Sequence, residues 1–249
     1  IMTARRFRPS WIGFLATLVV AAVCLQAAFW QLSRAEEKRT LASDLATRAE
    51  QGYQSMASLA VKADPHNYPL EVRGHFDNRY NILLDNRMLD GVAGYHLLTP
   101  LQTEAGQWLL VNRGWLPRGR DRAVLPEIPA IDGPVTVQGQ SYVYSPRTFV
   151  LAEDDLSEPS WPLRLQKVEM DVLSPLLGVE LAPFELRVAP GVPLEQGEQL
   201  PRVWHDPVMG PERHQAYAVQ WFAMAATVVI FFLAVSFRRR DADHPQMKA

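Results

Sequence analysis

Two long apolar stretches near the ends of the chain constrain its fold more than any other feature. Residues 11–32 and residues 217–237 contain no charged side chain and only a few polar ones. About 21 residues at roughly 1.5 Å per residue give a helix about 31 Å long. This length matches the hydrocarbon core of a bilayer, which is about 30 Å thick. The sequence therefore predicts a membrane-spanning helix at each end of the chain.

Arginine clusters beside the two stretches predict how the chain is oriented. Arg5, Arg6 and Arg8 precede the first stretch, and residues 238–240 are all arginine. Positively charged residues remain on the cytoplasmic side of a membrane. We therefore expect cytoplasmic tails at residues 1–10 and 238–249, two transmembrane helices, and one extracytoplasmic domain at residues 33–216. No targeting segment precedes the first stretch, which favours a bacterial plasma (inner) membrane over a mitochondrial one.

The charge balance and the cysteine content exclude several classes of protein. Residues 33–216 contain 18 lysines and arginines and 25 acidic residues, so this segment carries a net charge of −7. Nucleic-acid binding needs a concentrated basic surface, so we expect no nucleic-acid partner. The one cysteine, Cys24, lies inside the first apolar stretch, and this excludes a disulfide framework and a CxxC pair.

The first apolar stretch has three other interpretations. A cleaved signal peptide has a shorter apolar core and a small-x-small cleavage site. Here Trp30 and Gln31 follow the best small residues, Ala27 and Ala28. A lipoprotein anchor needs a small residue before the cysteine, where this chain has a valine, and the twin-arginine pattern is matched only loosely. The sequence therefore favours an uncleaved membrane anchor.

The segment between the two stretches has the pattern of an α+β domain. A helix is predicted to continue outward from residue 33 to about residue 56, because apolar residues recur there at helical spacing. Alternation of apolar and polar residues then predicts strands. Their ranges are 70–77, 80–84 (as the hairpin partner of the first), 95–101, 107–112, 135–143, 148–151, 162–168 and 184–188. A short helix is expected at residues 168–177, ended by Gly178. Short connections favour a mainly antiparallel compact sheet or small barrel.

Signatures of familiar enzymes are missing from the chain. It contains no complete nucleophile elbow, no HExxH and no glycine-rich phosphate loop before a helix. We therefore expect that the protein is not an enzyme. A membrane-tethered enzyme with an unrecognised site stays open as an alternative.

His214 stands out among the six histidines because it lies about one helical turn before the second apolar stretch. With Tyr217, Ala218, Trp221 and Ala225 it follows the spacing of one helix face. Such a face can stack against a flat apolar ligand, with the imidazole as an axial or hydrogen-bonding group. The same pattern is typical of an interfacial histidine followed by an aromatic belt, and spacing alone favours that simpler interpretation.

The first apolar stretch has a matching set of polar residues where it leaves the membrane. Gln31, Arg34 and Lys38 are spaced to lie on one side of a helix, and Trp30 lies at the depth of the aromatic belt. Two cations above an aromatic layer can hold carboxylates, such as the propionates of a porphyrin. The alternative is that both cations pair with nearby glutamates or with lipid phosphates.

A strand ending in a tight turn is predicted at residues 111–117, where Trp115 would anchor the turn. Arg113 has two interpretations there. It faces the membrane interface, or it has a purely structural role, and the pattern favours the structural role.

Four segments together resemble the surfeit-locus-one (Surf-one) family, which consists of assembly factors of cytochrome c oxidase. Residues 29–38 (FWQLSRAEEK) resemble the first-helix segment of that family. Residues 94–101 (GYHLLTPL) and 110–117 (LVNRGWLP) are similar to its central strands. Residues 214–222 (HQAYAVQWF) resemble its second-helix segment, and the order and topology also agree.

The resemblance implies an assembly factor that binds haem a transiently and helps its insertion into the catalytic subunit of the oxidase. Its partners would be subunit I, other assembly factors and membrane lipid. The resemblance also makes His214 the candidate iron ligand, with Tyr217 and Trp221 as the walls of its pocket. Together with the spacing on the first stretch, it leads to the hypothesis that Arg34 or Lys38 receives a propionate. The alternative is a scaffold that stabilises an oxidase assembly intermediate without touching a cofactor.

Overall fold

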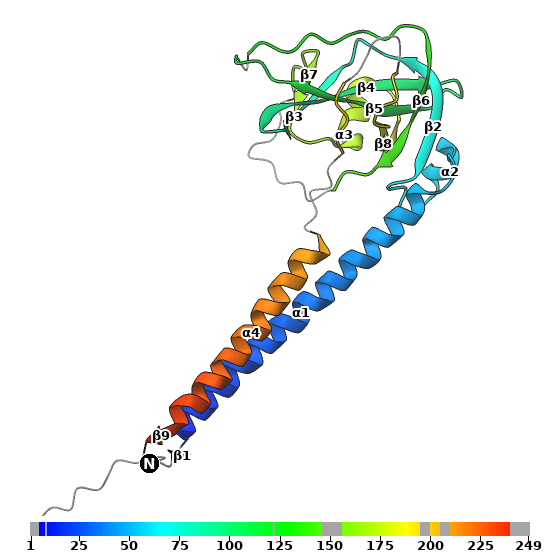
Figure 1. The fold of residues 1–249 in the computed structure, drawn as a ribbon. Helices are drawn as coiled ribbons and strands as arrows, with labels where there is room; N and C mark the ends of the chain where they lie inside the picture. Colours follow the sequence, from blue (N-terminus) through cyan, green and yellow to red (C-terminus); the bar gives the residue numbers. More distant parts are fainter. Residues whose placement is uncertain are drawn as a thin grey trace, which may run out of the picture. The chain divides into compact units, whose positions relative to one another are not determined.

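The computed structural model describes residues 5–7, 9–121, 123–145, 156–194, 200–204 and 210–239. Contacts divide the chain into two compact units (Figure 1). The helical unit comprises residues 1–43 and 207–249, and the strand-rich unit comprises residues 44–206.

Two antiparallel helices form the helical unit. Helix α1 (Trp11–Ala49) has 39 residues and α4 (Pro211–Ser236) has 26. Contacts between rings join them along their length, because Phe14 packs on Phe232 and Phe29 packs edge-on against Phe222. The short strand β1 (Arg5–Phe7), which precedes α1, pairs antiparallel with the short strand β9 (Phe237–Arg239), which follows α4. The start of α1 and the end of α4 therefore lie close to each other.

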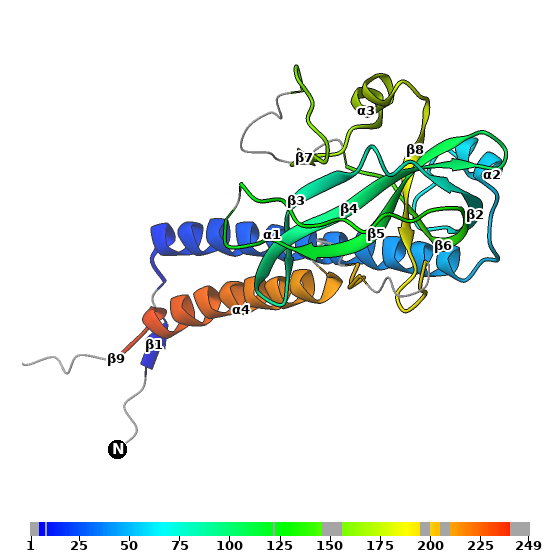
Figure 2. The ribbon, with the colours of Figure 1, turned by 90° about the horizontal axis from the view of Figure 1, so that it is seen from above.

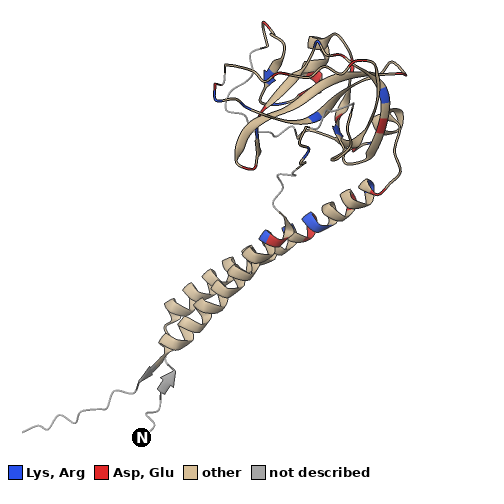
Figure 3. Cartoon of the chain, turned by 45° about the horizontal axis from the view of Figure 1, so that its top comes forward, with Lys and Arg blue, Asp and Glu red and all other residues tan. Residues whose placement is uncertain are grey.

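Only a narrow stripe of each helix is buried. Small residues occupy it, including Ala28 on α1 and Ala218 on α4, both completely buried. Large apolar side chains cover the remaining surface, and no charged residue interrupts the apolar lengths (Figure 3). Both helices are long and apolar enough to cross a membrane. This confirms the predicted apolar helix at each end. At about 1.5 Å per residue α1 is about 58 Å long, so it extends well beyond one bilayer core.

The strand-rich unit contains seven strands and two short helices within its described residues. The strands are β2 (Pro69–Phe76), β3 (Ile82–Leu89), β4 (Val92–Thr103), β5 (Trp108–Pro117), β6 (Pro134–Tyr142), β7 (Leu163–Leu165) and β8 (Leu181–Val188). The helices are α2 (Met56–Ala60), capped by Ser55, and α3 (Met170–Leu177). Gly178 ends α3 in the left-handed conformation, as the sequence predicts.

The strands form a small barrel with an extension. Their order is β2-β6-β8-β5-β4-β3-β7, and β2 also pairs with β4, so five strands close a ring (Figure 2). The closure needs Gly74, because a Cβ atom there would lie 2.1 Å from the backbone oxygen of Gln102 on β4. The ring encloses the main apolar core, to which β8 contributes Phe184, Leu186 and Val188.

One prediction about strand pairing holds in part and another is wrong. Most neighbouring strands pair antiparallel, as predicted, but the sheet is mixed, because β5 pairs with β8 and β3 with β7 in parallel. The predicted hairpin between residues 70–77 and 80–84 does not form. Phe76 pairs with Leu101, so β4 occupies the edge of β2 that β3 would need, and β3 pairs with β4 and β7 instead. The strand expected at residues 148–151 lies outside the described residues.

Alternation along the strands leaves a second, outward face on the barrel. Successive side chains of a strand point to opposite faces. Since Phe184, Leu186 and Val188 enter the core, Glu185 and Arg187 lie on the outer face of β8. This outer face carries the polar groups described below.

Candidate functional site

A direct contact between the two helices involves His214 and Gln31. Helix α4 begins at Pro211 after Gly210, so His214 lies in its first turn. The Nδ1 atom of His214 lies 2.7 Å from the Oε1 atom of Gln31. A carbonyl oxygen can only accept a hydrogen bond, so in this arrangement Nδ1 carries the proton. The lone pair on Nε2 is then available to a metal or to a hydrogen-bond donor.

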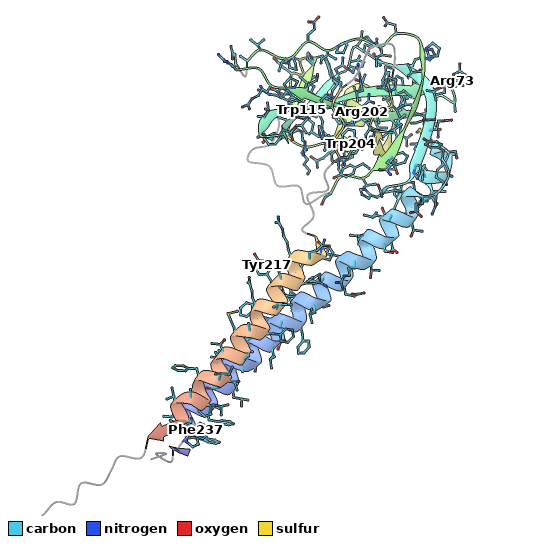
Figure 4. The ribbon with its side chains drawn as sticks, viewed as in Figure 1. Arg73, Trp115, Arg202, Trp204, Tyr217 and Phe237 are labelled. Carbon is cyan, nitrogen blue, oxygen red and sulfur yellow. The ribbon has the colours of Figure 1, made fainter. Side chains whose placement is uncertain are left out.

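The predicted stripe on α4 divides into a buried part and an exposed part. His214 and Trp221 are partly buried, and Ala218 and Ala225 are buried on the face that packs against α1. Tyr217 is 46% exposed and lies off this face (Figure 4). The structure therefore places His214 and Trp221 on one face and Tyr217 beside it.

The polar residues predicted on α1 divide in the same way. Gln31 and Lys38 are partly buried and lie on the stripe that contains the buried Ala35. Arg34 is exposed, its Nη1 atom lies 2.6 Å from Oε2 of Glu37, and its guanidinium lies 5.7 Å from the ring centre of Trp30. Arg34 thus has the glutamate partner that the sequence offered as an alternative. Lys38 forms no ion pair within the described part of the chain.

The donor set in the helical unit fits a haem better than a bare metal ion. No group of three His, Cys, Asp or Glu side chains able to hold a metal ion occurs among the described residues. A bare zinc site needs three or four protein ligands. A haem brings four nitrogen ligands of its own, so one protein side chain can be enough to hold its iron. One histidine with an oriented ring could therefore hold a haem, but not a bare metal ion.

A second polar cluster, which sequence analysis missed, lies on the outer face of the barrel. Glu185 is completely buried, and its carboxylate accepts hydrogen bonds from Arg187 Nε at 2.9 Å and from the Tyr144 hydroxyl at 2.5 Å. Asn112 Nδ2 lies 3.4 Å from the same carboxylate and 3.4 Å from Nδ1 of His96. A glutamate in an alternating strand normally predicts an exposed position, so no local signal marked this cluster.

The cluster changes the acidity of its members. Burial lowers the pKa of His96 to about 3, and the positive charges of Arg87 and Arg187 act in the same direction. His96 is therefore neutral at physiological pH. Burial and the charge of Glu185 raise the pKa of the Tyr144 hydroxyl, so it stays protonated and donates to the carboxylate. Burial disfavours the charged form of Arg187, but the attraction to Glu185 raises its pKa above the usual value.

Arg113 occupies the interior and does not face a membrane interface. It is completely buried, and it donates from Nη2 to the Pro129 carbonyl at 2.7 Å and from Nη1 to Thr99 Oγ1 at 3.3 Å. Its guanidinium also lies 5.6 Å from the ring centre of Phe76. The interpretation as an interface residue is wrong, and Arg113 has the structural role.

Comparison with known proteins decides the family. The sequence profile of the SURF1 family matches residues 18–226, which include most of both helices and the whole strand-rich unit. The chain belongs to the SURF1 family. The resemblance carried by the helix and strand motifs is thereby confirmed.

Relatives of this SURF1-family chain occur in bacteria and in animals. It is 24% identical to a SURF1-like protein of Rickettsia bellii over 88% of each chain. It is 25% identical to Surfeit locus protein 1 of the mouse, over 86% of this chain and 73% of the relative. The human protein of that name is 23% identical over 82% of this chain and 71% of the relative. The matched share of the chain exceeds the strand-rich unit alone, and the family profile reaches into both apolar helices.

Proposed function

We propose that the protein is a two-span membrane assembly factor for cytochrome c oxidase that holds haem a and aids its insertion into the catalytic subunit. Membership in the SURF1 family supports the role in oxidase assembly. The two apolar helices support attachment to a membrane. Subunit I of the oxidase, other assembly factors and membrane lipid are the proposed partners.

The oriented imidazole of His214 is the observation that carries the haem proposal. The Oε1 atom of Gln31 lies 2.7 Å from Nδ1 and accepts its proton in a hydrogen bond, so the lone pair is on Nε2. Histidines that bind metals commonly donate their second ring N–H to an oxygen acceptor, which fixes the tautomer and the ring orientation. This arrangement supports His214 as the residue that would hold the iron.

Neighbouring residues suggest how the remainder of the haem is held. Trp221 follows His214 by two turns on the packed face, where its ring would contact the porphyrin. Tyr217 is exposed and would cover an edge. Lys38 is the better propionate partner, because Arg34 is already paired with Glu37 and Trp30 lies under Arg34. When bound, haem a supplies an iron centre destined for electron transfer and oxygen chemistry, and this chain shelters it.

The proposed orientation follows from the arginines and from the pairing of the two ends. The pairing of β1 with β9 supports the placement of both ends on one side of the membrane. The positive-inside rule then assigns that side to the cytoplasm, and residues 33–216 lie outside. In a bacterium this corresponds to the inner membrane with the barrel in the periplasm.

Haem retention tests the proposal directly. The full chain is purified in detergent from cells that make haem a, and the Soret absorbance per mole of protein is measured. We expect bound haem in the wild type and about tenfold less in His214→Ala, because the axial bond is lost. His75→Ala is the matched control, because His75 is an exposed histidine on β2. Equal haem in the wild type and in His214→Ala removes His214 from the site.

A wild-type protein without haem would support the alternative function of a cofactor-free scaffold. That scaffold predicts a stable complex with the oxidase subunit in cells that lack haem a. Affinity purification from such cells distinguishes the two functions, because the haem-holding function predicts that the complex depends on haem a.

A further inference from the structure

A groove of about 430 Å³ lies on the outer face of the barrel, within the strand-rich unit. Its floor is a row of three residues on adjacent strands, since Pro69 pairs with Gln140 and Gln140 pairs with Arg187. The walls come from Ala49, Gln51, Gly52, Tyr53 and Trp204. Pockets that bind small molecules have volumes of roughly 300–1,000 Å³. The groove is thus large enough for a small ligand.

Arg187 gives the groove its charge. It is the only charged side chain among the described residues that line the groove. Its Nε atom donates to Glu185, while its two terminal nitrogens have no acceptor among the described residues. The guanidinium carbon lies 3.2 Å from the ring centre of Tyr142 and 5.4 Å from that of Trp204. The unused edge of the guanidinium is therefore available to a ligand in the groove.

The surrounding contacts hold this arginine in place before any ligand arrives. Glu185 is fixed from its far side by the Tyr144 hydroxyl at 2.5 Å. Trp204 donates from Nε1 to the Val188 carbonyl at 2.9 Å, and the ring of His96 packs edge-on against it at 5.4 Å. A side chain that is already ordered loses little entropy on binding. The site is thus preorganised for an anion.

The balance of charge and apolar surface selects the type of anion. A guanidinium edge matches the two oxygens of a carboxylate. Apolar surface beside the guanidinium comes from Tyr53, Pro190 and Trp204, which also line the groove. Glu185 already offsets the charge of Arg187, and the described residues that line the groove include no second lysine or arginine, so the two charges of phosphate would be less well compensated than the single charge of a carboxylate. We propose that this groove binds an organic carboxylate with an apolar body. Arg187 receives the carboxylate, and Trp204 packs against the body.

Calorimetric titration of the full chain in detergent tests this proposal with benzoate, benzamide and inorganic phosphate. Benzoate and benzamide have nearly the same shape, so the comparison isolates the carboxylate charge. We expect benzoate to bind at least roughly tenfold more tightly than benzamide or phosphate, as a charged hydrogen-bonded pair predicts. Equal affinities for benzoate and benzamide, or for benzoate and phosphate, would overturn the proposal.

Variants show whether binding occurs in this groove. A Cβ atom added at Gly52 meets no atom within 4 Å, so Gly52→Phe fills the groove without a backbone clash. We expect it to abolish benzoate binding. Gly119→Phe is the control, because Gly119 lies outside the groove and its nearest atom would be 3.9 Å away. Unchanged benzoate binding in Gly52→Phe, with an unchanged circular dichroism spectrum, would assign binding to another place and overturn the proposal.

A double variant tests the role of the arginine while avoiding an unpaired buried charge. Arg187→Gln combined with Glu185→Gln removes both charges together, so neither side chain is left as an uncompensated ion. The variant is expected to bind benzoate and benzamide equally. Retention of the tenfold preference would show that Arg187 does not receive the carboxylate.

The carboxylate can come from a free small acid or from the end of a peptide. An acetylated tripeptide ending in phenylalanine, in carboxylate and amide forms, distinguishes these sources. A carboxylate form that binds tenfold more tightly than benzoate would identify a chain end as the source. A peptide that binds no more tightly than benzoate would identify a free small acid as the source of the carboxylate. This groove does not depend on haem, so failure of either proposal leaves the other intact.

Discussion

The Nδ1 atom of His214 on α4 and the Oε1 atom of Gln31 on α1 lie 2.7 Å apart, and this hydrogen bond joins the two apolar helices. Ala28 and Ala35, both buried, lie one turn to either side of Gln31 on α1. A hydrogen bond in such apolar surroundings is poorly replaced by water. Gln31 therefore fixes both the tautomer and the direction of the His214 ring.

Replacement of Gln31 should weaken the proposed haem site without removing the ligand itself. In Gln31→Leu the histidine keeps Nε2 but loses the acceptor that holds Nδ1–H. Loss of such a supporting acceptor typically costs 10- to 100-fold in metal affinity. We expect about tenfold weaker haem retention and a shifted Soret maximum. Gln26→Leu is the control, because Gln26 lies on the exposed side of α1. Identical spectra and haem content for Gln31→Leu and the wild type would contradict the positioning role.

The pair formed by Glu185 and Arg187 should be strongly coupled in stability. Glu185 is completely buried and Arg187 is 14% exposed as a side chain, so removal of one partner leaves a poorly hydrated charge. We expect Glu185→Ala to lower the free energy of unfolding by about 3 kcal/mol, as for broken buried pairs. The double variant Glu185→Gln with Arg187→Gln should cost less than the sum of the single variants. A urea-unfolding double-mutant cycle measures this coupling, and strict additivity would contradict it.

His96 should make the strand-rich unit sensitive to acid. The pKa of His96 is about 3 in the folded chain and about 6.5 when exposed, so the folded state resists its protonation. The contribution of neutral His96 to the free energy of unfolding is complete above about pH 6.5, and it is lost as the pH falls from 6.5 toward 3. The loss is up to about 1.4 kcal/mol per pH unit.

Unfolding experiments between pH 6.5 and pH 4 can isolate this contribution. Two aspartates interfere less than free ones would in that range, because hydrogen bonds with Arg48 and with Arg79 lower the pKa values of Asp64 and Asp77 against the opposing effect of burial. His96→Gln removes the titrating group and should give a flatter dependence of the free energy of unfolding on pH. Parallel curves for the wild type and His96→Gln would show that protonation of His96 is not opposed by the fold.

Local sequence patterns predicted the helices and the strand faces but not which strands pair. The apolar length of α4 and its start near Pro211 depend on residues that are close together in the sequence, so both could be predicted from it. The pairing of β2 with β4 could not be predicted, because Phe76 and Leu101 are far apart in sequence and meet only when the barrel closes. For the same reason Glu185 reads as a surface residue of β8. Its burial depends on Tyr144 and Arg187, and no local pattern reveals those contacts.

The orientation of the helices can be tested with a reporter in the strand-rich unit. The turn at Asp90 and Gly91 joins β3 to β4, both residues have positive φ, and Gly91 is exposed with open space around it. Alkaline phosphatase inserted there folds only outside the cytoplasm. We expect an active enzyme, and the same reporter fused after residue 249 should be inactive. Activity at the C-terminal end and none at the turn would reverse the proposed topology.

Closure of the barrel should depend on the missing side chain at Gly74. The pairing of β2 with β4 joins Gly74 to Thr103, and a Cβ atom at Gly74 would lie 2.1 Å from the Gln102 oxygen. That oxygen belongs to a paired backbone and cannot move freely, so the strands must separate.

Gly74→Ala is therefore expected to lower the free energy of unfolding by about 3 kcal/mol, the upper range for overpacked sites. Gly52→Ala is the matched control, because its added methyl group meets no atom within 4 Å. The control should change stability by no more than about 0.5 kcal/mol. Thermal unfolding followed by circular dichroism in the strand region compares the two variants. Equal stability of Gly74→Ala and Gly52→Ala would mean that β2 and β4 do not close the ring in solution.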